Sequence, residues 1–221
     1  MNKRFLSVTV TLSLVLSFLL AIPATANTEG PPLPEDLWSY NTTADVTDIA
    51  IGDLNKDGKD DVVAIDNLLE TPDTLHAISG EGPADWQWQD VSLAGYAVAV
   101  GDINDDGWTE VVAGGHNGIA WVLNAYDKDG NLLWYYPVEG EVKDIEIGDV
   151  DGDSIDDIVA CNTIASHIYA INGTGHDITG SWPITSTPTP IVDLAIGQLD
   201  EQAGVDVAAI GVGGLYVYNS T

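Results

Sequence analysis

A unit of about 48 residues that occurs four times constrains the fold of this chain more than any other feature. Each copy has an apolar alternating run, an acidic segment and a second apolar run, and the copies lie at 46–65, 95–114, 142–161 and, in weaker form, 191–210. The residues that open the acidic segments are 49, 47 and 49 positions apart: Asp53, Asp102, Asp149 and Gln198. Four tryptophans recur at a constant interval of 48: Trp38, Trp86, Trp134 and Trp182. Repetition at this period is typical of arrays in which neighbouring units bury a shared core.

Each unit predicts four short β-strands. In the first unit an alternating run at 49–51 precedes the acidic segment, apolar runs follow at 61–65 and 75–78, and a fourth run carries the tryptophan. Period-two alternation and β-branched residues favour strands, and helical periodicity is absent after residue 26. Four-stranded units of this length, repeated radially, are typical of a β-propeller. The sequence therefore predicts an all-β fold, a β-propeller of four four-stranded blades.

The phase of the repeat predicts how the propeller closes. Residues 36–41 have the pattern of a lone fourth strand, and residues 215–219 have that of a third strand without a fourth. Pairing of these two segments would complete the last blade and remove the exposed sheet edges of an open array. We expect closure within one chain, with the N-terminal strand completing the last blade. The alternative is a half-ring that needs a second chain, which makes the protein a homo-oligomer.

Three of the four acidic segments have the composition of a cation-binding loop. Side-chain oxygens stand at positions 1, 3, 5 and 9, and position 7 offers its backbone carbonyl, an all-oxygen set that suits Ca²⁺. The predicted ligands are Asp53, Asn55, Asp57, Lys59 and Asp61; Asp102, Asn104, Asp106, Trp108 and Glu110; and Asp149, Asp151, Asp153, Ile155 and Asp157. Gly58 and Gly107 at position 6 permit the positive φ of a tight loop, whereas the third loop has Ser154 there and a glycine at Gly152. We expect about three calcium ions.

The cation-free alternative is a set of acidic turns stabilised by Asx hydrogen bonds. The mutual repulsion of carboxylates packed into nine residues favours the cation. The fourth segment has only two carboxylates among its ligand positions and predicts no tightly held ion: Gln198, Asp200, Gln202 and Asp206.

The loop and its flanking apolar strands resemble the FG-GAP and VCBS repeats of integrin-α-like propellers. The resemblance covers residues 46–206 and rests on the calcium-loop pattern DxDxDGxxD, which the first loop follows as DLNKDGKDD. It implies a calcium-binding β-propeller. The chain lacks the Phe-Gly pair and has AID, AGG, ACN and AIG in place of Gly-Ala-Pro, so an integrin-type binding surface is not implied. The segments TLHAISGEGPADWQW and VLNAYDKDGNLLWYY are similar to the tryptophan-docking repeats of quinoprotein propellers.

The N-terminal residues have the composition of an export signal. Lys3 and Arg4 precede an apolar run at 5–22, and the small residues at 24–26 fit a cleavage site. We expect a signal peptide at 1–26, a linker at 27–35 and the propeller at 36–221. The expected product is secreted or at the cell surface, without stable membrane insertion after cleavage; an uncleaved anchor is the alternative. Cys161 is the single cysteine, so no internal disulfide braces the chain.

The charge of the chain disfavours two classes of partner. Without the signal, four lysines and no arginine stand against 35 acidic residues, which gives a net charge of −31. Such a surface repels the phosphates of nucleic acids and anionic lipid headgroups. Asp48, Asp144 and Asp193 recur early in the first strand of their units and are candidates for lining a central channel, either as a polar lining or as a cation site.

The motifs favour binding over catalysis. No nucleophile elbow, phosphate-binding loop or zinc pattern is present, and the four histidines have no metal-type spacing. We expect a non-catalytic, calcium-stabilised module for extracellular recognition or adhesion, with a protein or glycan ligand. One alternative is a structural component of a cell envelope or a multi-chain ring. Another is a propeller enzyme such as a polysaccharide lyase or a quinoprotein, which the absence of arginine disfavours.

Overall fold

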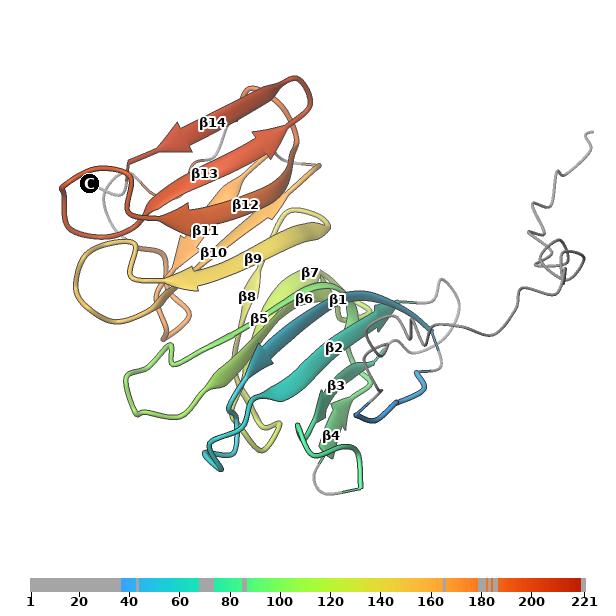
Figure 1. Cartoon of the computed structure of the whole chain (residues 1–221). Helices are drawn as coiled ribbons and strands as arrows, with labels where there is room; N and C mark the ends of the chain where they lie inside the picture. Colours follow the sequence, from blue (N-terminus) through green and yellow to red (C-terminus); the bar gives the residue numbers. More distant parts are fainter. Residues whose placement is uncertain are drawn as a thin grey trace, which may run out of the picture. The chain divides into compact units, whose positions relative to one another are not determined.

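The computed structural model describes residues 37–42, 44–67, 74–84, 87–164, 166–178, 182, 184 and 187–219. Within these ranges every named element is a β-strand, which confirms the predicted all-β class (Figure 1). The same ranges hold no helix long and apolar enough to cross a membrane. The predicted signal peptide at 1–26 and linker at 27–35 lie outside the described residues.

The described strands form four antiparallel sheets in chain order. The first has the order β1 (Asp45–Gly52), β2 (Asp61–Asn67), β3 (Leu75–Ile78), β4 (Gln87–Asp90). The second has the order β5 (Ala94–Gly101), β6 (Glu110–His116), β7 (Trp121–Tyr126), β8 (Leu132–Pro137). The third contains β9 (Val142–Gly148), β10 (Asp157–Asn162) and β11 (Ile168–Ile171), and the fourth contains β12 (Ile191–Gly197), β13 (Asp206–Gly211) and β14 (Gly214–Tyr218).

The first hairpin of each sheet follows the sequence repeat. β1 and β2 pair down to Gly52 opposite Asp61, so that the acidic segment forms the connection between them. The register shifts near the start of the inner strand, between Val46 and Asp48 in the first sheet and at the equivalent place in the other three. A bulge of this kind bends a strand and increases its twist. The repeat therefore specifies the shape of the inner strand as well as its existence.

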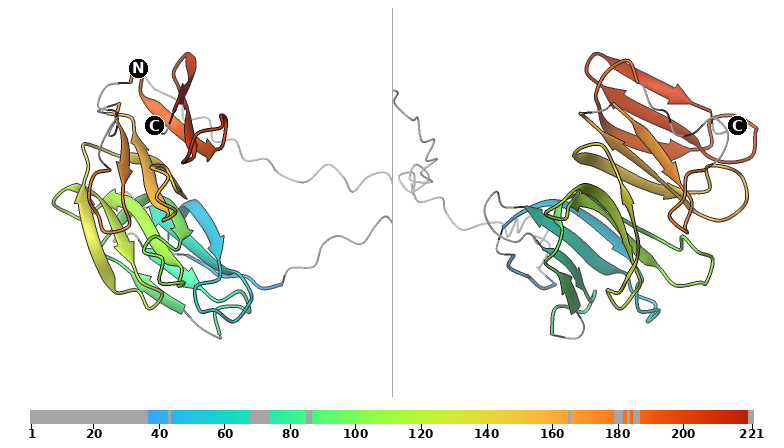
Figure 2. Two further views of the ribbon diagram at one scale, coloured as in Figure 1. Left: turned by 90° about the vertical axis from the view of Figure 1, so that its left-hand side faces the viewer. Right: turned by 180° about the vertical axis from the view of Figure 1, so that it is seen from behind.

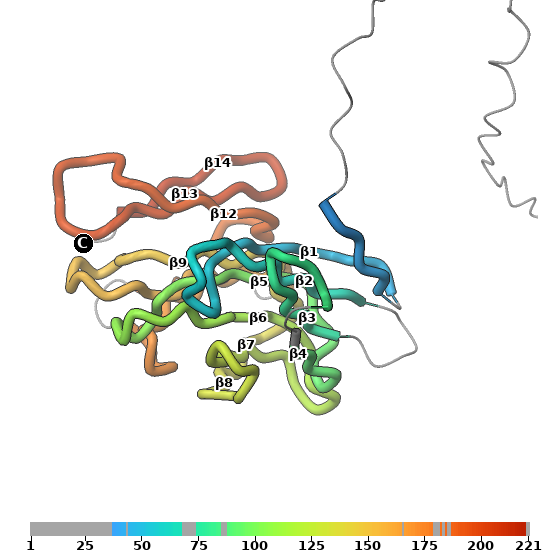
Figure 3. Tube along the Cα trace, turned by 60° about the horizontal axis from the view of Figure 1, so that its bottom comes forward, coloured from blue at the N-terminus to red at the C-terminus, as the bar shows by residue number. Residues whose placement is uncertain are grey.

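The sheets pack in succession through their first strands. β1 lies against β5, β5 against β9, and β9 against β12 (Figures 2 and 3). Apolar clusters fill the spaces between successive sheets, with Ile65 and Val98 in the first, Ile103 and Ile145 in the second, and members of the third and fourth sheets in the last. Successive sheets that pack side by side with their first strands innermost are typical of a β-propeller.

Tryptophans lock the first sheet to the second and the second to the third. The indole N–H of Trp88 donates to the carbonyl of Lys128 at 2.9 Å, and that of Trp134 donates to the carbonyl of Gly173 at 2.8 Å. A Cβ atom on Gly130 or Gly175 would lie 2.8 Å from these rings, so only glycine fits beneath them. The series predicted from the sequence holds at Trp38 and Trp134, but the second docking residue is Trp88. Trp86 lies outside the described residues.

The described residues do not show the predicted closure within one chain. Residues 37–41 form no strand, and β14 pairs with β13 alone among the described strands. The N-terminal segment contacts the first sheet, where the indole of Trp38 donates to the carbonyl of Gly80 at 2.8 Å, in the turn after β3. β12 also shares no packing with β1 comparable to that between successive sheets.

Candidate metal sites

The three predicted cation loops share one backbone geometry. They connect β1 to β2, β5 to β6 and β9 to β10, and each contains two left-handed residues, at positions 4 and 6. These pairs are Lys56 and Gly58, Asp105 and Gly107, and Gly152 and Ser154, with φ between 56° and 85°. The third loop therefore keeps the turn although its glycine has moved from position 6 to position 4. The fourth loop has a single left-handed residue, Gly204.

The acidic residue at position 1 organises each loop from inside. One carboxylate oxygen accepts the backbone amide of position 6, from Gly58 to Asp53 at 3.0 Å, and the second and third loops repeat this bond at 2.8 and 3.0 Å. Side chains at positions 3 and 5 accept the amides two residues further on. The Asx hydrogen bonds of the cation-free alternative are thus present, and they point the carboxylates into the loop.

The carboxylate at position 9 is the buried anchor of the loop. It accepts the amide of position 2, as Asp61 does from Leu54 at 3.0 Å and Glu110 does from Ile103 at 3.2 Å. Asp157 in the third loop and Asp206 in the fourth do the same, and all four acids are at most 2% exposed. Because the fourth loop keeps this bond, the position-9 acid has a role in the fold that is independent of any ion.

Burial makes the position-9 acids reluctant to ionise. It raises the pKa of Glu110 to about 7, with the nearby charge of Asp106 adding to the effect. Burial likewise raises the pKa of Asp157 to about 6, and the Asp151 charge adds to it. The pKa of Asp61 is also raised, by burial first. These loops concentrate negative charge in a place where it is poorly solvated.

Two observations test whether the loops suit a cation. In the third loop, Asp149, Asp151 and Asp153 each offer a carboxylate oxygen, and these oxygens lie within 4.8 Å of one another. In the first loop, Oδ1 of Asp53 is buried and has no hydrogen-bond partner among the described residues. Converging carboxylates and a buried acceptor without a donor fit a hard cation bound by oxygen. The residues present therefore fit Ca²⁺.

The fourth loop has a different interior. The side-chain amide of Gln198 donates to the carbonyls of Gln202 and Gly204, at 2.8 and 3.1 Å. Position 1 of the fourth loop therefore presents an N–H donor to the loop interior, where the other three loops present a carboxylate. Asp200 keeps its turn, since it accepts the amide of Gln202 at 2.7 Å.

Loops from successive sheets contact one another. The Lys56 ammonium of the first loop lies 4.0 Å from the ring centroid of Trp108 in the second, and the Lys128 ammonium lies 5.1 Å from it. A Cβ atom on Gly152 in the third loop would lie 3.0 Å from the Cβ of Ala203 in the fourth. The four loops together are called the acidic rim, defined as segments 53–60, 102–109, 149–156 and 198–205. The lysines on Trp108 could not be paired with it from sequence spacing.

The recurring inner-strand acids join sheets through the backbone. A carboxylate oxygen of Asp48 accepts the amide of Val98 on the next sheet at 2.9 Å, and one of Asp144 accepts the amide of Leu194 at 2.6 Å. Burial, together with the neighbouring Asp193, raises the pKa of Asp144 to about 6. Two of the three candidate channel acids therefore hydrogen-bond the inner strand of one sheet to that of the next.

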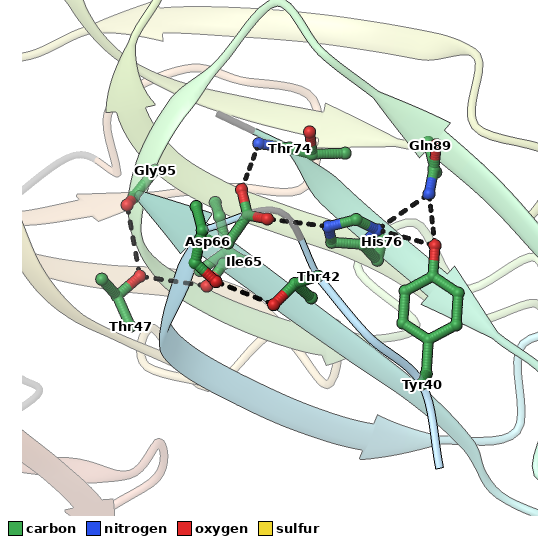
Figure 4. Close-up of polar contacts among 10 residues, drawn as sticks. Tyr40, Thr42, Thr47, Ile65, Asp66, Thr74, His76, Gln89 and Gly95 are labelled. Atoms are coloured by element: carbon green, nitrogen blue, oxygen red, sulfur yellow. Dashed lines mark hydrogen bonds and ion pairs between the residues drawn. The ribbon is translucent and has the colours of Figure 1, made fainter. Parts of the chain in front are cut away.

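A buried polar network around His76 was not predicted from the sequence (Figure 4). The Nε2 atom of His76 lies 3.1 Å from a carboxylate oxygen of Asp66, which is fully buried. The Nδ1 atom lies 3.0 Å from the side-chain amide of Gln89 and 3.3 Å from the hydroxyl of Tyr40. The network ties the N-terminal segment to the first sheet. His76 carries no spacing signal, because its partners come from three separate segments.

Comparison with known proteins supports the fold and leaves the family open. No family model and no curated protein matches the chain. The solved structure of BBS1N in complex with ARL6DN matches with a TM-score of 0.55 at 14% identity, over 83% of this chain and 55% of BBS1N. A protein of unknown function from Bacteroides caccae gives a TM-score of 0.48 at 12% identity, over 82% and 59%, and the V. cholerae biofilm matrix protein Bap1 gives 0.40 at 16%, over 80% and 38%. The chain thus spans about half the length of BBS1N, and this likeness shows an all-β fold of the propeller type.

Proposed function

We propose that the chain is a calcium-stabilised propeller that acts outside the cell as a non-catalytic recognition module for a protein or glycan. The observation that carries the proposal is the repeated loop, in which one backbone geometry presents converging oxygens three times. The resemblance of these loops to FG-GAP and VCBS repeats supports calcium as the ion. The predicted export signal supports an extracellular location, where millimolar calcium suffices for modest affinities of about 10⁻⁴ to 10⁻³ M.

Calcium would be held by the oxygens at positions 1, 3, 5 and 7 of each loop. In the third loop the carboxylates of Asp149, Asp151 and Asp153 repel one another at short range, and a divalent cation removes that repulsion. In the first loop the buried Oδ1 of Asp53 gains a partner. The bound ion would rigidify the hairpin that follows each inner strand, and ligand binding along the acidic rim would use this rigid surface.

The buried pair of His76 and Asp66 supports a non-catalytic role. His76 and Asp66 are 3% and 0% exposed, and both ring nitrogens of His76 lie within hydrogen-bond distance of protein partners. A general base must reach the substrate that it deprotonates. This pair is placed to hold the fold together, so the proposal assigns no catalytic residue.

The charge of Glu110 gives a prediction on pH. Its folded pKa of about 7 lies above the ordinary 4.5, so the ionised form disfavours the folded state. In calcium-free buffer the wild-type chain should lose at most about 3 kcal/mol of stability as the pH rises from 4.5 to 7. The Glu110→Gln variant should lack this loss, as urea unfolding at several pH values would show.

Calcium should reverse the effect of the same substitution. If Glu110 helps to neutralise the ion, Glu110→Gln will be less stable than the wild type in 10 mM calcium although it is more stable in EGTA at pH 7. Glu201→Gln, in the exposed part of the fourth loop, removes the same charge and is the matched control. An equal effect of Glu110→Gln with and without calcium would contradict a bound ion in the second loop.

Recognition is tested by binding to an array of glycans and to a panel of extracellular matrix proteins. The calcium-loaded chain should bind a subset of probes, and EGTA should abolish the signal. The Asp102→Asn/Asp106→Asn variant should lose binding, whereas Glu139→Gln, whose exposed side chain lies between β8 and β9 and outside the rim, should retain it. Silence of a folded, calcium-loaded chain across both sets would contradict the recognition role and favour the structural alternative.

A further inference from the structure

Two apolar faces of the described sheets have no partner among the residues that the structure describes. The leading face consists of Val46, Ile49 and Ile51 on β1. The trailing face consists of Leu199, Ile210, Leu215 and Val217 on the fourth sheet and its acidic loop. Both faces are 42–68% exposed at these positions. Side chains of this size on sheet faces mark an interaction surface more often than a solvated one.

The repeat shows what these faces are built to contact. The equivalents of Ile49 on the later sheets are Val98, Ile145 and Leu194, which are 4–6% exposed because each packs against the preceding sheet. On the other side, the equivalents of Leu215 are Leu75, Leu123 and Ile168, which are fully buried against the following sheet. The leading and trailing faces are therefore the two halves of an interface that the chain forms three times internally.

A glycine in each sheet makes this interface specific. Gly52, Gly101 and Gly148 end the inner strands, and a Cβ on them would lie 2.6–2.9 Å from Val100, Ile147 and Ile196 of the next sheet. Gly197 is the equivalent on the fourth sheet, and nothing lies within 4 Å of its Cβ position. Ile51 is the residue equivalent to Val100. Gly197 and Ile51 are thus a matched recess and side chain that do not meet in the described structure.

The two faces also carry the halves of a polar contact that other inner strands make. Asp48 and Asp144 accept the amides of Val98 and Leu194 on the following inner strands. Asp193 occupies the equivalent position on the trailing face and is exposed. Ile49 occupies the position of Val98 on the leading face. Bringing the faces together would let Asp193 accept the amide of Ile49.

The N-terminal segment occupies the place of an outer strand of a preceding sheet. Trp38 and Tyr40 contact the first sheet as Trp134 and Tyr136 of β8 contact the third. The ring of Tyr40 lies edge-on to His76 with centroids 5.4 Å apart, and the ring of Tyr136 lies edge-on to Tyr169, the equivalent of His76, at 6.0 Å. Residues 37–42 thus sit where a fourth strand belongs, and the sheet β12–β14 contains three described strands.

We propose that two copies of this chain associate head to tail, with the leading face of each on the trailing face of the other. Residues 37–42 of each copy would add the fourth strand to the β12–β14 sheet of its partner. The product is a closed ring of eight sheets with twofold symmetry, within the range of known propellers. We choose a second copy as the occupant because each unpaired feature of the trailing face has its counterpart on the leading face of the same chain. The Gly197 recess matches Ile51, Asp193 matches the amide of Ile49, and the β12–β14 sheet matches residues 37–42. The inference does not depend on the ligand of the assembly.

The internal pairs fix the register of the new contact. Tyr135 of β8 pairs with Asn124 of β7, and their equivalents are Ser39 and Tyr216. Ser39 of one copy should therefore lie opposite Tyr216 of the other. Since Cys161 is fully buried, cysteines placed at these two positions can be oxidised selectively.

The test mixes two single-cysteine variants, Ser39→Cys and Tyr216→Cys, in buffer with calcium and 0.5 M salt, which screens the like charges of the copies. A disulfide-linked dimer should form in the mixture and not in either variant alone. Sedimentation of the wild type should give twice the mass of one chain. A double variant whose disulfide forms within a monomer would overturn the proposal in favour of single-chain closure, as would a wild type that remains monomeric at all concentrations.

Charged substitutions on the faces provide a second measurement. Ile49→Asp and Leu215→Asp should each weaken dimerisation by ~100-fold or more, because burying a charge on an apolar contact is strongly unfavourable. Ile119→Asp is the matched control, since Ile119 is 91% exposed in the β6–β7 turn. A mixture of the two face variants should form dimers again through the one interface without an introduced charge. Dimerisation of either variant alone at wild-type strength would overturn the proposed faces.

Discussion

Removing calcium from the folded chain is expected to lower its melting temperature by roughly 15–30 °C. A site at a hundredfold excess of ligand over its dissociation constant contributes about 2.7 kcal/mol, so three loops contribute about 8 kcal/mol. In a domain of this size 1 kcal/mol corresponds to about 2–4 °C. The effect is large because no disulfide supports the fold and because the loops end three of the inner strands.

Scanning calorimetry in 10 mM calcium and in EGTA measures this shift. Magnesium at the same concentration is the control for screening of the acidic surface by divalent cations, and it should restore only a minor part of the stability. The Asp151→Asn/Asp153→Asn variant should bind one ion fewer and lose about a third of the shift. An identical melting temperature with and without EGTA would refute the three-site proposal.

Replacing Ile103 by alanine should cost about 2–5 kcal/mol of unfolding free energy. Ile103 is position 2 of the second loop, and its fully buried side chain belongs to the apolar cluster between the second and third sheets. Its amide also donates to Glu110, so a cavity here loosens the anchor of the loop. The substitution should therefore weaken calcium binding in addition to lowering stability.

Urea unfolding of Ile103→Ala with calcium present gives the free energy, and calcium titration gives the affinity. Ile119→Ala removes the same atoms from a side chain that is 91% exposed and should change stability by less than about 0.5 kcal/mol. If both substitutions lowered the unfolding free energy equally, the side chain of Ile103 would not contribute to the apolar packing between the second and third sheets.

Local patterns made most of the strands predictable. The alternating run before each acidic segment gives an inner strand, and the β-branched run after it gives a second strand, as in β10 at Asp157–Asn162. Such patterns report which face of a strand is buried, and that information lies within a few residues. The positive φ of Ser154 was not predictable in the same way, because the third loop places its glycine at the other left-handed position.

Contacts between distant segments were the part that the sequence did not give. Residues 37–41 have the pattern of a strand, but Trp38 and Tyr40 bind the first sheet through partners about 40 positions away. A strand pattern cannot tell which edge a segment joins. The same limit explains why the 48-residue series pointed to Trp86, whereas the residue that docks is Trp88.

The candidate sites were predictable in composition and less so in role. The oxygens at positions 1, 3 and 5 converge as the spacing suggests in the third loop. Asp61, Glu110 and Asp157 were predicted as ligands, and each spends an oxygen on a backbone amide. At position 9, a carboxylate that anchors a loop and one that faces an ion look alike in a sequence, since both are acidic residues at the same place in the motif.

The docked tryptophans determine how the chain should unfold. Trp88 closes on the turn at Lys128 and Trp134 on the turn at Gly173, so each lock spans two repeats. No repeat contains both the tryptophan and the turn of one lock. Cooperativity in repeat proteins depends on such nearest-neighbour terms. A fragment cut at the sequence boundaries of one repeat should therefore be unfolded, and the whole array should melt as one unit rather than sheet by sheet.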